Sequence, residues 1–224
     1  MQQESRTVHL WENLYSQQGL GPKYPQDSVV RFVFNNLKAG QKVLDLGCGA
    51  GRHAIFLAEN GFEAYGIDIS ENAILEAEKR TQEKNLSVVY KISSCESIPF
   101  EDEFFDALIA YGTIYYGDVY MVKHAIDEIF RLLTKDGKAL IAVRSLEDYR
   151  YDSSLEIEPH TIIVHEQNKT KSAANENGMK MHFFSRTELQ KLFAGFARMD
   201  IERQIVTHEN ESYADNDFLV FLQK

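Results

Sequence analysis

The sequence predicts a doubly wound α/β fold, in which helices cover both faces of a mostly parallel sheet. From residue 42 onward, short β-branched runs alternate with amphipathic stretches, which is the pattern of βαβ units. The 224 residues are 44% hydrophobic and 12% aromatic, which is enough apolar material for one sizeable core. We therefore expect a single domain over residues 1–224.

Five strands are expected in the regular part of the chain, with helices in most of the gaps. A helix over 71–85 follows the second strand, because Ser70 can cap its free amide groups and small apolar residues recur at core spacing. Another helix begins near Val119 and carries apolar residues at steps of three and four as far as Leu133. The five strands are expected at 42–46, 63–67, 87–92, 105–111 and 138–144.

The regular alternation breaks over residues 145–182, which are polar and contain Pro159. We interpret this stretch as an insertion that forms a substrate lid or a hairpin, with strands at 161–165 and 179–184 on either side of a polar turn region.

The regular pattern resumes after the insertion. Ser185 and Glu188 have the spacing of a capping box, so a helix is expected to begin there. Two closing strands follow at 198–208 and 218–223, and the polar turn between them favours antiparallel pairing.

Composition argues against several kinds of partner and location. The formal charge of −10 repels polyanions, and the nearest basic stretches, Lys79-Arg80 and 198–203, are interleaved with acids, so we expect no nucleic-acid partner. The longest apolar runs are far shorter than the roughly 20 residues that span a bilayer. The first twenty residues lack the apolar stretch of a secretory signal, and two cysteines, Cys48 and Cys95, are too few for a disulfide scaffold. A cytoplasmic protein is expected.

The first strand leads into three alternating glycines and then a helix, which indicates a loop that a ligand approaches closely. Glycines without Cβ let the backbone lie against the ligand, and the helix presents free amides. A dinucleotide fingerprint would place the third glycine where Arg52 stands, and Asp45 would repel a pyrophosphate but attract an ammonium group. The pattern of Gly47, Gly49 and Gly51 therefore favours a cationic ligand over a nicotinamide dinucleotide.

The second strand ends in an acid, Asp68, where a carboxylate can accept both hydroxyls of a ribose. Helix capping is the alternative role for Asp68, although Ser70 already suits it. Ile69 offers a surface on which adenine can pack.

These segments resemble the class I methyltransferases. Residues 43–51 resemble the family's motif I, and Asp68 resembles its motif II acid. Residues 93–106 are similar to the family's G-D-A-x-x-L-P-F…F-D stretch, although Ser94 stands where an Asp usually receives the adenine amino group. Residues 132–138 resemble the family's L-x-P-G-G turn, with Lys135-Asp136 in place of Pro-Gly. The resemblance implies strand order 3-2-1-4-5-7-6, with strand 7 antiparallel.

The resemblance also implies S-adenosylmethionine as the cofactor and S-adenosylhomocysteine as its product. Residues 1–40 are expected to form a helical cap over the cofactor that includes Trp11, Tyr15, Lys23 and Tyr24, with a buried staple as the alternative role for its aromatic residues. The cofactor-binding residues implied are Tyr24, Asp45, Gly47, Cys48, Gly49, Gly51, Asp68, Ile69, Ser94, Cys95, Glu96 and Tyr111.

Residues near the ends of the fourth and fifth strands are candidates for the acceptor side, because methyl transfer needs the acceptor held in line and sometimes a base. Tyr111, Tyr115 and His182 are the catalytic candidates, with simple packing as the alternative for each. Arg144 faces either an anionic acceptor or a surface ion pair. The substrate candidates are Tyr15, Tyr115, Tyr116 and Arg144.

We therefore expect methyl transfer to an oxygen, nitrogen or carbon of a small molecule, by a monomer or a homodimer. The Asn-Pro-Pro-Tyr-like tetrad of adenine-N6 enzymes and the Pro-Cys pair of cytosine-C5 enzymes are missing. No acidic cluster follows the fifth strand and the histidines show no zinc spacing, so no metal is expected. The alternative is a module that binds the cofactor as a sensor or scaffold without catalysis.

Overall fold

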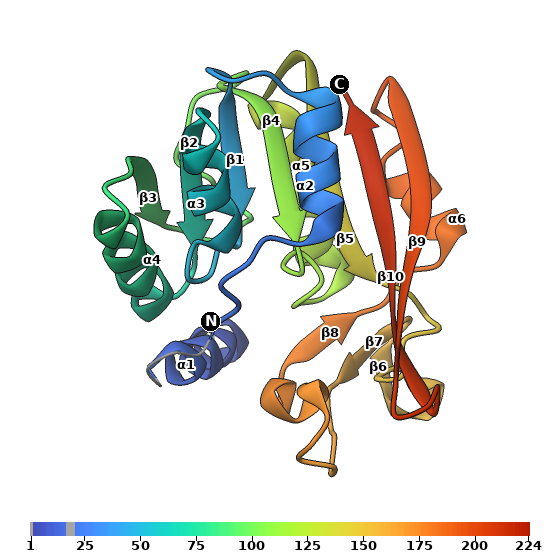
Figure 1. The fold of residues 1–224 in the computed structure, drawn as a ribbon. Coiled ribbons are helices and arrows are strands. Elements are labelled where there is room, and N and C mark those ends of the chain that lie inside the picture. Colours follow the sequence, from blue (N-terminus) through green and yellow to red (C-terminus); the bar gives the residue numbers. More distant parts are fainter. Residues whose placement is uncertain (1, 17–20) are drawn as a thin grey trace.

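The computed structural model describes residues 2–16 and 21–224, and a seven-stranded sheet forms its centre (Figure 1). The expected strand order is confirmed, with β10 antiparallel to its neighbours β5 and β9. From one edge to the other the strands are β3 (Val88–Ile92), β2 (Glu63–Asp68), β1 (Lys42–Leu46), β4 (Phe105–Tyr111), β5 (Leu133–Arg144), β10 (Tyr213–Gln223) and β9 (Arg198–His208).

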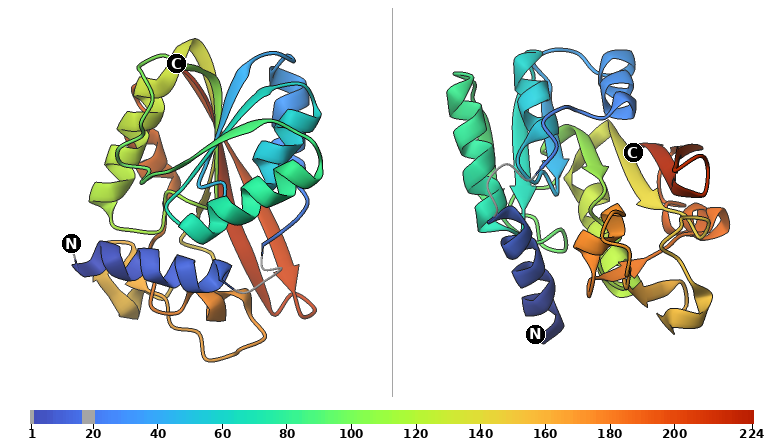
Figure 2. Two further views of the ribbon diagram at one scale, coloured as in Figure 1. Left: turned by 90° about the vertical axis from the view of Figure 1, so that its left-hand side faces the viewer. Right: turned by 60° about the horizontal axis from the view of Figure 1, so that its bottom comes forward.

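Helices cover both faces of this sheet, as the doubly wound prediction requires (Figure 2). The helices α2 (Asp27–Asn36), α3 (Arg52–Glu59) and α4 (Glu71–Glu83) lie on one face, and α5 (Val119–Leu132) and α6 (Arg186–Leu192) lie on the other. Side chains of a strand alternate between the two faces. Leu108 and Ala110 of β4 therefore join the core under α5, whereas Ala107 and Ile109 join the core under α2 and α3.

Local capping fixes where the helices begin, and the predicted caps are confirmed. The Ser70 hydroxyl accepts a hydrogen bond from the Ala73 amide at 3.1 Å, and the Ser185 hydroxyl accepts one from the Glu188 amide at 3.2 Å. The helix α5 begins at Val119, as expected, and ends at Leu132, one residue earlier than expected.

Two strands are longer than their hydrophobic patterns predict. The strand β5 begins at Leu133, which pairs with Phe105 before a register shift, so the segment expected as a turn belongs to the strand. The strand β10 begins at Tyr213 rather than Phe218. Its first half carries Asp215 and Asp217, whose carboxylates pair with arginines, so the apolar pattern by which a strand is recognised is missing there.

The remaining elements lie at the edge of the large sheet where its parallel strands end (Figures 1 and 2). There the helix α1 (Gln2–Tyr15) lies near a three-stranded sheet of β6 (Glu156–Glu158), β7 (Thr161–Ile163) and β8 (Lys180–His182). The strands β7 and β8 pair antiparallel, as the hairpin prediction expects, whereas β6 is an addition that the sequence does not reveal. Short 3-10 helices, η1 (Ser153–Leu155) and η2 (Ser172–Glu176), complete this region.

Within the two described ranges of the chain, no helix combines the length and the apolar character that crossing a bilayer requires.

Candidate functional site

The glycine loop after β1 adopts a conformation that other residues would strain. Gly47 has a φ of +69°, and a Cβ there would clash with the Thr113 side chain. Gly49 has a φ of +53°, and a Cβ there would overlap the hydroxyl of Tyr15 on α1. The loop is therefore packed between the segment after β4 and the N-terminal helix, and glycine is required at both positions.

The carboxylate of Asp68, at the end of β2, holds this loop in place. Its Oδ2 accepts a hydrogen bond from the Gly49 amide at 2.8 Å, and its Oδ1 accepts one from the Ser70 amide at 2.9 Å. Each carboxylate oxygen retains a lone pair for a ligand hydroxyl. Burial raises the pKa of Asp68 to about 6, with a smaller contribution from the nearby charge of Asp45.

A cavity of about 530 Å³ opens at the carboxyl ends of β1, β2 and β4, the place where doubly wound sheets bind ligands. Its volume is in the range typical of small-molecule sites. The cavity is lined by Thr7, Trp11, Tyr15, Leu46, Gly47, Ile67, Asp68, Ile69, Ser93, Ser94, Cys95, Glu96, Gly112, Thr113, Tyr116, Gly117, Asp118, Tyr120, Met121 and Lys180.

Half of the residues that the resemblance implies for the cofactor lie on the cavity wall, and the other half lie elsewhere. Those on the wall are Gly47, Asp68, Ile69, Ser94, Cys95 and Glu96. Those not on the wall are Tyr24, Asp45, Cys48, Gly49, Gly51 and Tyr111. Tyr24 is 83% exposed, and the buried Cys48 contacts the backbone of the glycine loop itself.

Asp45 points into the protein rather than toward the cavity. Its Oδ2 accepts a hydrogen bond from the Ala54 amide at 3.2 Å, and its Oδ1 lies 3.5 Å from the Nδ1 of His53. Burial lowers the pKa of His53, although Asp45 opposes the shift. Asp45 therefore anchors the start of α3.

Tyr111 ends β4 but is not on the cavity wall. It shares a face of β4 with Ala107 and Ile109, and its ring lies 5.7 Å from that of His53. Its hydroxyl donates to Gln204 at 3.4 Å. The alternation of side chains along a strand explains this placement, because Tyr111 follows Ala107 and Ile109 at steps of two and so shares their face.

The other tyrosine candidates separate into two groups. Tyr15 and Tyr116 line the cavity, whereas Tyr115 is only 3% exposed and does not. Burial raises the pKa of all three phenols, that of Tyr115 to about 12. Each is therefore a neutral hydroxyl near neutral pH and a poor general base.

Arg144 forms ion pairs inside the protein and is not on the cavity wall. Its Nη1 lies 3.0 Å from Asp217 Oδ1, 3.4 Å from Asp148 Oδ2 and 3.7 Å from Asp215 Oδ1. These contacts favour the ion-pair role of Arg144 over binding of an anionic acceptor. The ion pair is buried, whereas the sequence suggests one on the surface.

His182 is also enclosed, with a side chain that is 1% exposed. Its Nε2 lies 3.0 Å from Glu188 Oε1, and its Nδ1 lies 2.8 Å from Thr161 Oγ1. It is not among the cavity's lining residues, so the structure favours the packed alternative over a catalytic base.

Several lining residues escape prediction from the sequence, and most lie between the end of β4 and the first turn of α5. Asp118 caps α5 by accepting a hydrogen bond from the Met121 amide at 3.0 Å, and it pairs with Lys180 of β8 at 3.0 Å. The lining residues after β4 could have been identified from their place in the sequence, because the segment after β4 starts at the carboxyl edge of the sheet. The missed lining residues are Thr7, Leu46, Ile67, Ser93, Gly112, Thr113, Gly117, Asp118, Tyr120, Met121 and Lys180.

Comparison with known proteins agrees with this geometry. Residues 43–137, which include the glycine loop, Asp68 and the segment after β4, match the methyltransferase domain family. Over this range the chain resembles a methyltransferase domain. The matched range contains the glycine loop and the carboxyl ends of β1 and β2, where the cavity lies.

Individual relatives are more distant. Phosphoethanolamine N-methyltransferase 1 of Zea mays is 34% identical over 108 residues, which cover 48% of this chain and 21% of that protein's length. This chain thus spans about a fifth of the length of that relative. A solved SAM-dependent methyltransferase of Methanosarcina mazei has a TM-score of 0.72 at 22% identity, with 86% of this chain and 96% of that one covered. NodS, an N-methyltransferase of Bradyrhizobium japonicum solved with S-adenosylhomocysteine, has a TM-score of 0.69 at 17% identity, with 97% and 98% covered. These two structures share the fold.

Proposed function

We propose that the domain binds S-adenosylmethionine in the cavity and transfers its methyl group to an oxygen, nitrogen or carbon atom of a small molecule. The observation that carries the proposal is the position of Asp68. Its carboxylate lies on the cavity wall, holds the glycine loop through the Gly49 amide, and keeps lone pairs for the two ribose hydroxyls.

The wall next to Asp68 fits an adenosyl group. Ile69 supplies an apolar surface, and Ser94 and Glu96 supply oxygen atoms. The Ser94 hydroxyl lies 3.3 Å from Glu96 Oε2, so the serine is already engaged within its own loop. An Asp that usually accepts a hydrogen bond from the adenine amino group is replaced by Ser94 in this chain. Glu96 therefore supplies the acceptor for that amino group.

The rest of the cavity suits an acceptor of modest size. Trp11 and Tyr116 meet edge to face with ring centroids 4.9 Å apart, and Tyr120 and Met121 add apolar surface. Such a wall packs an acceptor and excludes water, which is what displacement at a methyl carbon requires. The net charge of −10 also disfavours a nucleic-acid acceptor. The names of the maize relative and of NodS make nitrogen the first acceptor atom to test.

The chemistry divides simply between cofactor and protein. S-adenosylmethionine supplies an electrophilic methyl group on a sulfonium. The chain positions the acceptor and keeps water out, while the tyrosines near the cavity stay neutral because burial raises the pKa of Tyr15 and Tyr116. An acceptor that arrives as a neutral nucleophile needs no base from the protein.

Isothermal titration with S-adenosylhomocysteine tests the cofactor part of the proposal. We expect one binding site per chain, with affinity strongly reduced in Asp68→Ala and unchanged in Asp27→Ala, whose carboxylate is exposed and pairs with Arg31 within α2. No binding to the unmodified protein would refute the proposal.

Incubation with labelled S-adenosylmethionine and a broad metabolite extract tests the transfer step. A labelled small-molecule product that Asp68→Ala does not form is the expected result. Cofactor binding without any labelled product would instead favour the sensor or scaffold alternative.

A further inference from the structure

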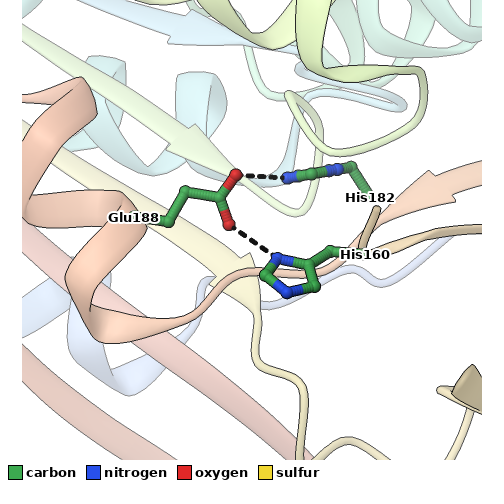
Figure 3. A group of neighbouring side chains, drawn as sticks. All are labelled: His160, His182 and Glu188. Carbon is green, nitrogen blue, oxygen red and sulfur yellow. Dashed lines mark hydrogen bonds and ion pairs between the residues drawn. The ribbon is translucent and has the colours of Figure 1, made fainter. Parts of the chain in front are cut away.

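Three side chains that commonly bind metal ions meet where the three-stranded sheet contacts α6, away from the cavity. His160 lies in the turn between β6 and β7, His182 ends β8, and Glu188 lies in the first turn of α6 (Figure 3). One ligand atom of each lies within 4.8 Å of the other two. We propose that His160, His182 and Glu188 form a binding site for Zn²⁺.

The distances are close to those that a tetrahedral zinc ion needs. Zinc bonds of about 2.0–2.2 Å place neighbouring donor atoms roughly 3.3 Å apart. Glu188 Oε1 lies 3.0 Å from His182 Nε2, and Glu188 Oε2 lies 3.1 Å from His160 Nδ1. These two contacts use different oxygens of Glu188, so an ion bound through one oxygen requires the imidazoles to move toward it and toward each other. One donor atom of each residue already lies within 4.8 Å of the other two, and the His160 side chain is 35% exposed and has room to move.

The donor set selects zinc rather than magnesium or calcium. Imidazole nitrogens suit Zn²⁺, whereas Mg²⁺ and Ca²⁺ prefer oxygen ligands. Two nitrogens and one carboxylate leave the fourth position for water, and the exposed side of His160 gives that position access to solvent.

The hydrogen bond behind His182 is the kind that orients a metal-bound histidine. Its Nδ1 lies 2.8 Å from the hydroxyl of the fully buried Thr161, which also lies 3.4 Å from the Pro159 carbonyl oxygen. A hydroxyl can donate to Nδ1 while Nε2–H faces Glu188, and it can accept from Nδ1–H when Nε2 binds an ion. The Thr161 hydroxyl thus serves the site with or without the ion.

An ion here would stabilise the position of the hairpin on the rest of the domain. Glu188 belongs to α6 on the large sheet, whereas both histidines belong to the three-stranded sheet. The His182 amide also donates to the Tyr115 carbonyl at 2.8 Å, next to the cavity-lining Tyr116. The site therefore joins the insertion to the segment that forms one wall of the cavity.

The alternative is a metal-free clamp, in which two imidazole N–H groups donate to one carboxylate. The two differ in their response to zinc, and the test does not depend on methyl transfer. Chelator-treated full-length protein is titrated with ZnCl₂ by calorimetry, and its thermal unfolding is followed with and without the metal. We expect binding at one site per chain and a higher unfolding temperature with zinc.

Variants locate the binding. His160→Ala is expected to weaken zinc binding by at least about tenfold and to abolish the thermal shift. His124→Ala is the matched control, since that half-buried ring contacts its own helix through the Tyr120 carbonyl and its loss should leave both readouts unchanged. Glu188→Gln, which keeps the side-chain shape, tests the same site independently. The proposal is overturned if the unmodified protein binds no zinc, or if His160→Ala and Glu188→Gln bind it as tightly.

Discussion

The raised pKa of Asp68 leads us to expect that the affinity for the cofactor depends on pH. Its pKa rises from an ordinary 3.8 to about 6 on folding, because burial disfavours the charged form. The folded protein therefore holds a proton between pH 3.8 and about 6 that the unfolded chain has released, and the contribution of Asp68 to stability falls as pH rises through that window. Ribose hydroxyls donate to the ionised form, so binding must expel this proton at low pH.

We therefore expect the affinity for S-adenosylhomocysteine to fall about tenfold between pH 7.5 and pH 5, measured by calorimetry in matched buffers. Asp217→Asn is the control, because burial also raises the pKa of Asp217 to about 6 but this residue pairs with Arg144 away from the cavity. That variant should keep the pH dependence, whereas Asp68→Asn should lose it. A flat profile in the unmodified protein would contradict this account.

At the scale of single residues, the sequence locates strand ends better than it locates side chains. Asp68 is predicted for the cavity and lines it, but Tyr111 and Asp45 are predicted there and point elsewhere. Both lie within two residues of a strand end. Successive side chains of a strand point to opposite faces of the sheet, so a shift of one residue changes the face. Periodicity alone does not show that Asp45 is engaged by the Ala54 amide, because that contact depends on how α3 docks.

At the scale of elements, α1 forms one wall of the cavity and one side chain fastens it. Glu12 accepts hydrogen bonds from the free amides of Glu71 and Asn72 at the start of α4, at 2.5 Å and 3.2 Å. Trp11 and Tyr15 of the same helix line the cavity. The helix that covers the cavity is thus attached to the N-terminus of α4, where a carboxylate also interacts favourably with the helix dipole.

We expect Glu12→Ala to loosen this attachment by about 1 kcal/mol, the usual cost of losing a helix cap, which is about a fivefold increase in local opening. Hydrogen exchange should speed up in α1 and at the start of α4, and the affinity for S-adenosylhomocysteine should fall. Glu83→Ala, at the exposed other end of α4, is the matched control. Unchanged exchange in α1 of Glu12→Ala would show that other contacts hold the helix.

The elements themselves are predictable where local patterns are strong. The strand β1 and the start of α5 at Val119 match their predictions because apolar periodicity and turn residues agree. The strand β6 and the first half of β10 are missed because their residues are polar, so the apolar alternation by which a strand is recognised is missing. Each pairs with the strand next to it in the sequence, β6 with β7 and β10 with β9, and this pairing is not visible in the residue pattern.

At the scale of the whole molecule, one buried guanidinium connects the insertion, the large sheet and the cavity wall. The Arg150 side chain is 1% exposed, and it contacts Asp148 at 3.0 Å, Asp215 of β10 at 2.6 Å and Glu176 of η2 at 2.6 Å. The other oxygen of Glu176 accepts a hydrogen bond from the cavity-lining Tyr116 at 2.7 Å. The strand order is predictable from the family resemblance, but this network is not, because its members come from four separate stretches of the chain.

Replacing Arg150 with methionine keeps the buried volume and removes the charge, which leaves Asp148 with Arg144 as its remaining ion-pair partner in the described part of the chain. Breaking a buried ion pair from one side costs about 3–5 kcal/mol, since an uncompensated charge stays inside the protein. We expect a loss of that size in the free energy of unfolding by urea. Arg198→Met is the control, because the Arg198–Asp200 pair is exposed and should contribute less than about 1 kcal/mol. Equal effects of the two substitutions would mean that the Arg150 network does not hold the insertion on the sheet.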